Sequence, residues 1–211
     1  MVAVSPLSPR LLELRFEQRG AALWAALYAH GRPIQYSYLR DALALWSVQT
    51  VYGGRPWAAE MPSAGRPLSW EILLGLRRRG VELCWLTHAA GLSSTGDAEL
   101  DRALPLAERY DIPDITVAAI ERARRRGARI IAVGTTCVRA LETVTDEQAD
   151  THPGEGWTRV IITPQRGIRA VNAMLTGMHE PRATHLAMLE ALASREHLRT
   201  AYEEALSERY L

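Results

Sequence analysis

A chain of 211 residues is long enough for one sizeable domain and too short for two comfortable ones. Hydrophobic residues make up 47% of it, so we expect a packed core rather than wholesale disorder. The formal net charge of +1 argues against a dominant polyanion-binding surface, because phosphate contacts need clustered cations. The arginine runs at 77–79 and 124–126 end predicted helices, where cations complement the helix dipole and stay solvated.

The predicted elements alternate between short apolar strands and helices. The first half holds a strand at 10–16, a buried helix at 21–30, an element of either kind at 43–52, a helix at 70–79 and a strand at 81–86. The second half holds a strand at 108–112, a helix at 114–126, a strand at 129–133, a helix from 138, strands at 160–163 and 167–171, and helices at 184–193 and 196–207. This order predicts an α/β fold, a layered domain with a mostly parallel or mixed sheet flanked by helices.

No segment predicts membrane insertion or secretion. The N-terminus lacks a charged start followed by an apolar stretch, and no apolar run reaches the length that spans a membrane. Cys84 and Cys137 lie inside apolar runs and show neither a pairing pattern nor metal-ligand spacing. We therefore expect reduced cysteines, no metal site and a cytoplasmic protein.

The most informative segment for function is the turn Gly134-Thr135-Thr136. It follows an apolar strand and opens a helix, and in parallel sheets ligands collect at the carboxyl ends of strands. The glycine permits close backbone approach, and the hydroxyls with the helix N–H groups form a polar nest that tolerates anions. The turn is neither a Walker loop nor a Gly-x-Gly-x-x-Gly motif. We expect it to hold a small polar ligand.

Two further residues are candidates for chemistry. Arg139 lies one turn into the helix, where it either faces the same ligand or forms an ion pair with Glu142 at helical spacing. His179 lies in a loop before a helix, a position that suits a general acid or base or a helix-capping histidine. His88, His179 and His185 are too scattered in the sequence to predict a metal site.

Five ordered blocks resemble one enzyme family. The segments Arg129-Ile-Ile-Ala-Val-Gly-Thr-Thr-Cys-Val-Arg-Ala-Leu-Glu142 and Leu175-Thr-Gly-Met-His-Glu-Pro-Arg-Ala-Thr-His-Leu-Ala-Met-Leu189 are similar to signatures of the S-adenosylmethionine:tRNA ribosyltransferase-isomerase family of queuosine biosynthesis. Three shorter blocks match in the same order: 49–52, 60–65, and Glu108 with Tyr110. The resemblance covers most of the chain.

The resemblance implies a reaction in which S-adenosylmethionine is a substrate. Members of the family remove a proton from its ribosyl 5′ carbon, which the sulfonium acidifies. That carbon becomes attached to the aminomethyl group of 7-aminomethyl-7-deazaguanine in a tRNA, adenine and methionine leave, and epoxyqueuosine-tRNA forms. No metal and no separate redox cofactor is implied.

The resemblance also implies roles for individual residues. His179 is the candidate for proton transfer, and Arg139 for binding a carboxylate or phosphate. The remaining candidates bind substrate, with the two threonines holding the adenosine or methionine part: Ser63, Gly65, Gly134, Thr135, Thr136 and Thr184.

Members of the family are longer than this chain. Residues 1–19 are interpreted as a remnant strand of the family's small β-barrel, most of which is lacking, and residues 20–211 as the α/β catalytic-type domain. The lacking segments predict unpaired sheet edges, so a second protein chain or self-association is expected besides S-adenosylmethionine and tRNA. The alternative hypotheses are a non-catalytic or partner-dependent S-adenosylmethionine-binding homologue acting on a different acceptor, and a fragment without an independent role.

Overall fold

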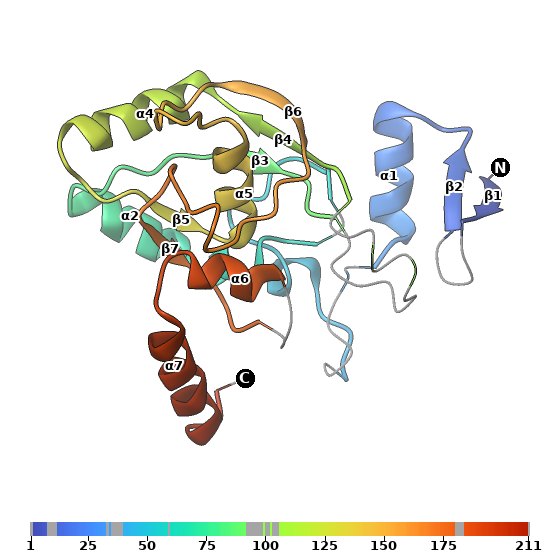
Figure 1. The fold of residues 1–211 in the computed structure, drawn as a ribbon. Coiled ribbons are helices and arrows are strands. Elements are labelled where there is room, and N and C mark those ends of the chain that lie inside the picture. The colour runs from blue at the N-terminus through green and yellow to red at the C-terminus, as the bar shows by residue number, and fades with distance from the viewer. Residues whose placement is uncertain are drawn as a thin grey trace. The chain divides into compact units, whose positions relative to one another are not determined.

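The computed structural model describes residues 2–7, 12–32, 34, 40–58, 60–91, 99, 102, 106–179 and 184–210. The chain divides into two compact units, which are described one at a time and labelled in Figure 1. The first unit contains Met1–Gln49 and Gly91–Leu106, and the second contains Thr50–Ala90 and Ala107–Leu211. The assignment of residues 1–19 to a barrel remnant stays a prediction.

Among its described residues, the first unit holds a two-stranded sheet and the helix α1. Strands β1 (Val2–Pro6) and β2 (Leu12–Phe16) pair antiparallel, and α1 (Gly20–His30) follows them. The predicted strand is confirmed over its described part, and the predicted helix is confirmed. The expectation that α1 is buried is wrong, because none of its residues is buried. A 3₁₀ turn, η1 (Leu45–Ser47), occupies the segment predicted as helix or strand.

The second unit carries the remaining helices and strands of the described chain. In order they are the 3₁₀ turn η2 (Ser63–Gly65), α2 (Trp70–Arg78), β3 (Thr87–His88), β4 (Glu108–Ile112), α4 (Asp114–Arg125), β5 (Ile131–Val133), α5 (Thr135–Thr143), β6 (Gly154–Thr158), β7 (Ala173–Leu175), α6 (Thr184–Glu190) and α7 (Arg195–Ser207). Ser69 caps α2, because its hydroxyl accepts a hydrogen bond from the backbone N–H of Ile72.

The strands of the second unit form two small sheets. The order β3-β4-β6 is antiparallel throughout, and β5 pairs with β7 in parallel (Figure 1). The α/β class is therefore confirmed, and the pairing is mixed. Among the described strands only β5 and β7 are parallel. The expected ligand position at the carboxyl ends of parallel strands therefore applies to this one pair.

Three predicted strands are wrong, at residues 81–86, 160–163 and 167–171. These segments make no ladder, although Ile162 and Val171 are 1% and 6% exposed and belong to the core. A short apolar run indicates that side chains are buried, but it does not specify whether the backbone pairs with another strand. The strands lie beside these runs, at β3, β6 and β7.

Strand β6 is not among the predicted strands, and it contains two glycines, Gly154 and Gly156. A Cβ at Gly156 would lie 2.8 Å from the hydroxyl oxygen of Tyr110, its register partner on β4. The glycine is therefore needed for close cross-strand packing, a role that glycine has in strands as well as in turns.

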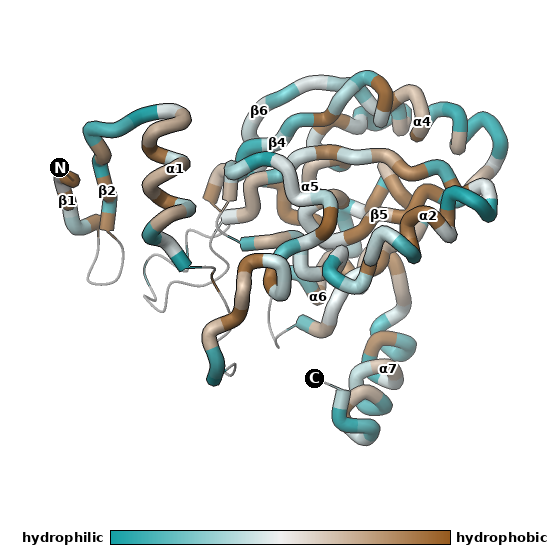
Figure 2. Tube along the Cα trace, turned by 180° about the vertical axis from the view of Figure 1, so that it is seen from behind, coloured by the Kyte–Doolittle hydropathy of each residue, from teal (hydrophilic) through white to brown (hydrophobic). Residues whose placement is uncertain are grey.

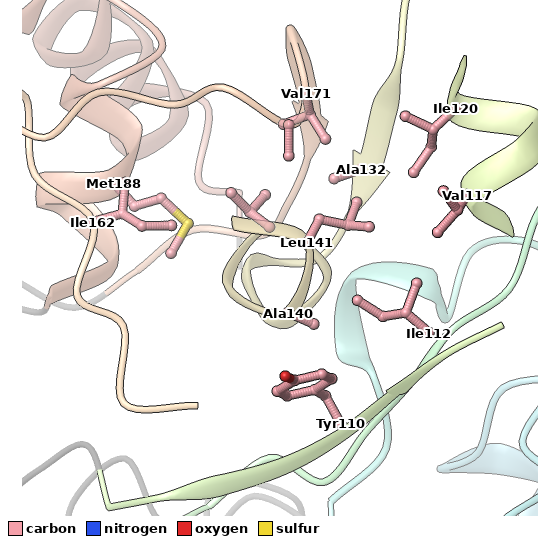
Figure 3. Packing of buried hydrophobic residues seen from close by; sticks show 12 residues of the cluster. Tyr110, Ile112, Val117, Ile120, Ala132, Ala140, Leu141, Ile162, Val171 and Met188 are labelled. Carbon is pink, nitrogen blue, oxygen red and sulfur yellow. The ribbon is translucent and has the colours of Figure 1, made fainter. Parts of the chain in front are cut away.

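The core of the second unit surrounds α5. Met188 and Ile162 lie on one side of this helix, and Ile112, Val117 and Ile120 on the other (Figure 3). Helix α4 buries the face that carries Val117 and Ile120, while Ile115 is 75% exposed. Figure 2 shows that α4 changes from hydrophobic residues in its first turns to hydrophilic ones at its end. The described helices include none with the length and apolar character to cross a membrane.

Candidate functional site

The predicted strand, turn and helix at residues 129–144 are confirmed, as β5, Gly134 and α5. Gly134 has φ +94°, in the region that favours glycine, and its N–H donates to the Leu175 carbonyl of β7 at 2.9 Å. Its own carbonyl accepts from the N–H of Cys137 at 3.1 Å. Thr135 is buried and Thr136 is half-buried at the first turn of the helix. The turn thus presents the start of α5 at the end of a parallel strand.

The 3₁₀ turn η2 lies against this helix start. A Cβ built on Gly134 would lie 3.8 Å from the Cβ of Ala64, so the predicted residues Ser63 and Gly65 come close to the turn. Gly65 is buried, and a Cβ there would lie 1.6 Å from the hydroxyl oxygen of Tyr52. Packing against Tyr52 accounts for this glycine, while substrate binding at Ser63 and Gly65 stays a prediction.

Arg139 extends away from its own helix to β4. Its Nη1 donates to the Glu108 carboxylate, and its Nε donates to the Val160 carbonyl at 2.9 Å. The guanidinium side chain is 9% exposed and the Glu108 side chain 6%. The alternative prediction of an ion pair between Arg139 and Glu142 is therefore wrong. Arg139 instead joins α5 to the first residue of β4.

Glu142 is occupied by a different set of donors. Its Oε1 accepts from the backbone N–H groups of Arg169 and Ala170, each at 2.6 Å, and its Oε2 accepts from the Arg166 guanidinium. Because this fully buried carboxylate is saturated with donors, we interpret it as a structural clamp on the loop that precedes β7.

His88 lies in the site, although the sequence analysis assigned it no role. Its side chain is 2% exposed, and its Nε2 lies 3.3 Å from Glu108 Oε2. Burial lowers the pKa of His88 to about 4, against the opposing influence of the Glu108 charge. The one available signal was its place at the end of an apolar run, and that signal could not show that β3 and β4 are neighbours.

Three nitrogens of this cluster have no hydrogen-bond partner within the described part of the chain. They are Nδ1 and Nε2 of His88 and Nη2 of Arg139. Buried polar atoms in folded proteins are nearly always paired, so these atoms mark a site organised for something besides stability.

His179 joins the cluster through a second histidine. Its ring stacks on His185, with centroids 4.8 Å apart and planes at 22°, and its Nε2 lies 2.9 Å from the Thr176 hydroxyl. The Tyr202 hydroxyl of α7 accepts from the His179 backbone N–H at 2.9 Å. Burial, aided by His185, lowers the pKa of His179 to about 4, so its ring is neutral at pH 7.

His185 connects the stacked pair to the ion pair. Burial lowers the pKa of His185, and so does the positive charge of Arg139, which places the ring within electrostatic reach of that side chain. Thr184, the first residue of α6, is exposed, and residues 180–183 lie outside the described chain. The histidines that are scattered in the sequence therefore gather around Glu108 and Arg139. No three described His, Cys, Asp or Glu side chains are arranged to hold a metal ion.

Comparison with known proteins identifies relatives of the whole chain. A family model described as queuosine biosynthesis protein matches residues 4–211. The chain is 39% identical to the S-adenosylmethionine:tRNA ribosyltransferase-isomerase of Symbiobacterium thermophilum over 77% of its own length and 48% of that protein. It is 32% identical to the enzyme of the same name from Moorella thermoacetica, over 98% of this chain and 61% of the relative.

One solved structure is also similar. The S-adenosylmethionine tRNA ribosyltransferase of Thermotoga maritima superposes with a TM-score of 0.56 at 31% identity. The match covers 70% of this chain and 47% of that one. The chain spans about half the length of the proteins it matches, between 47% and 61% of each of these three.

Proposed function

The chain belongs to the queuosine biosynthesis protein family, and we propose that it binds S-adenosylmethionine and uses it as a ribosyl donor. The observation that supports the proposal best is the buried cluster of Glu108, Arg139 and His88 beside the stacked histidines. It combines a fixed cation, neutral imidazoles and unpaired buried nitrogens. Clefts with perturbed titratable groups are where active sites concentrate.

The proposed proton acceptor is His179. The sulfonium of S-adenosylmethionine acidifies the ribosyl 5′ carbon, and a neutral imidazole has a lone pair that accepts a proton. Burial holds the pKa of His179 at about 4, so the acceptor form dominates at pH 7. The 2.9 Å contact between Nε2 and the Thr176 hydroxyl fixes the ring, which leaves Nδ1 for the substrate.

We place the substrate between η2 and the start of α5. Gly134, Thr135 and Thr136 provide a turn with positive φ and two hydroxyls, which suits the hydroxyl groups of a ribosyl moiety. Ser63 on η2 and Thr184 at the first residue of α6 are the further proposed substrate contacts. The acceptor in this proposal is the 7-aminomethyl-7-deazaguanine of a tRNA, which implies action in the cytoplasm.

The test is product formation by the full chain. Purified protein is incubated with S-adenosylmethionine and tRNA that carries 7-aminomethyl-7-deazaguanine, and adenine and methionine are quantified by liquid chromatography. We expect equal amounts of the two products and epoxyqueuosine in the digested tRNA. His179→Gln should reduce product formation by about two to four orders of magnitude while S-adenosylmethionine still binds. Absence of both products, with tRNA present, contradicts the proposal.

The second candidate is a partner-dependent S-adenosylmethionine-binding protein. One observation favours it: the two-stranded sheet β5-β7 carries exposed apolar residues, Ile131 at 53% and Leu175 at 44%. Strand edges with apolar side chains recruit other chains. Binding of S-adenosylmethionine without turnover, together with a dimer or larger species in sedimentation, would favour this candidate over the first.

A further inference from the structure

Two observations define the chemistry of a ligand that fits the cluster. Arg139 uses Nη1 for Glu108 and Nε for Val160, and only Nη2 is without a partner among the described residues. Glu108 and Val160 fix the plane of the guanidinium, so the direction of its remaining donors is set before any ligand arrives. A buried charged donor of this kind matches an anionic oxygen, and carboxylates and phosphates are the usual partners.

His88 supplies the complementary group. The Glu108 carboxylate oxygen, 3.3 Å from Nε2, favours the tautomer with the proton on that nitrogen. Nδ1 then presents a lone pair, and it is also without a partner in the described chain. The cluster therefore offers a cationic donor at Arg139 and a neutral acceptor at His88, both held by one carboxylate.

A zwitterionic α-amino acid group carries the matching pair, a carboxylate and an ammonium. We propose that the cluster is an amino-acid subsite: Arg139 binds the α-carboxylate and His88 Nδ1 accepts from the α-ammonium of S-adenosylmethionine. Glu108 is a positioning residue that orients both side chains. This inference rests on the proposed function, because S-adenosylmethionine is the ligand that brings the amino-acid group to the site.

Charge balance supports the zwitterion over a phosphate. Glu108 and Arg139 neutralise each other, and burial lowers the pKa of both His88 and His185, so the cluster favours no surplus positive charge. A phosphate dianion would enter without a countercharge, which is costly in a buried environment. An α-amino acid group adds no net charge, and each of its two ends meets a group of suitable polarity.

The test compares S-adenosylmethionine with its decarboxylated analogue, which keeps the ammonium, by calorimetry on the full chain. We expect the wild type to bind the decarboxylated compound about 10- to 100-fold more weakly, the effect of one charge-assisted hydrogen bond. Arg139→Lys keeps the positive charge but loses the planar donor pair, and it should reduce this preference to about threefold or less. His88→Gln should weaken both compounds by a similar factor and leave the preference unchanged.

Arg166→Lys is the matched control, because Arg166 pairs with the second buried glutamate, Glu142. It should leave the preference at the wild-type value. Equal affinity of the wild type for the two compounds overturns the inference while the proposed function stands. Failure of S-adenosylmethionine to bind overturns both. If Arg139→Lys does not fold, the wild-type comparison and the His88→Gln result still decide the matter.

Discussion

Helix α5 contributes Arg139 to one buried ion pair and Glu142 to another, and the two pairs are built differently. At Glu142 the carboxylate is saturated by two backbone N–H groups and Arg166. At Arg139 the pair with Glu108 leaves a guanidinium nitrogen, and the neighbouring His88 nitrogens, without partners in the described chain. Saturation is what a stabilising clamp needs, since each unpaired buried group costs free energy. The contrast indicates that the Glu142 pair stabilises the fold and the Arg139 pair serves a ligand.

The largest expected effect is on the saturated pair. Glu142→Ala leaves the N–H groups of Arg169 and Ala170 and the guanidinium of Arg166 without their acceptor. We expect the free energy of unfolding to fall by about 3–5 kcal/mol, as when one member of a buried pair is removed. Urea denaturation followed by circular dichroism measures it. A loss below about 1 kcal/mol would show that the clamp is dispensable, and the contrast between the two ion pairs would fail.

Next in size is the packing that brings η2 to the helix start. Gly65→Ala places a Cβ 1.6 Å from the Tyr52 hydroxyl oxygen, so the ring or the turn has to move. Overpacking of this kind costs about 1–3 kcal/mol, and S-adenosylmethionine affinity should fall with it if η2 contacts the ligand. Gly177→Ala is the control, because a Cβ there meets no atom within 4 Å. Equal unfolding free energies for the two variants would contradict the prediction.

The buried histidines make the cluster around Arg139 sensitive to pH. His88 has a pKa of about 4 in the folded chain and about 6.5 when unfolded, so the unfolded chain binds more protons between these values. Stability therefore rises with pH across this window and falls as the pH drops from 7 to 5, by about 1–2 kcal/mol for His88. His88→Gln should flatten the curve of urea midpoint against pH. An unchanged slope would mean that His88 titrates alike in both states.

The sequence predicted well what depends on neighbours along the chain. The predicted bounds of α2 and α4 agree with the structure to within one residue at each end. Caps and positive φ are local requirements, and Ser69 precedes α2 while Gly80 and Gly127 follow the two helices. The turn at Gly134 was predictable for the same reason. Runs such as 160–163 were misread as strands because burial of Ile162 does not require backbone pairing.

The site was predictable only in part, since its partners are distant in sequence. Helical spacing predicted Glu142 as a possible partner of Arg139, but the partner is Glu108 on β4. Only the folded chain brings Arg139 and Glu108 together. His88 reaches the same carboxylate because β3 pairs with β4. No element was predicted between these two segments, so the sequence did not indicate that they are neighbours. The stacking of His179 on His185 likewise depends on the path of the chain before α6.

The smallest effect is expected on the outer face of β4, where Arg109 pairs with Glu155 at 3.0 Å and lies 4.0 Å from the ring centre of Trp57. The side chains of the pair are 42% and 66% exposed, so water screens the two charges. Without the Glu155 carboxylate, water can still hydrogen-bond to the Arg109 guanidinium. Glu155→Gln should change the free energy of unfolding by less than about 1 kcal/mol and leave ligand preference untouched. Glu108, one residue before Arg109, faces the interior, and Glu108→Gln should cost several times more because Arg139 stays buried without its countercharge. Urea denaturation measures both changes in the free energy of unfolding. Equal changes for Glu155→Gln and Glu108→Gln would contradict the view that burial makes the Glu108 ion pair the more important one.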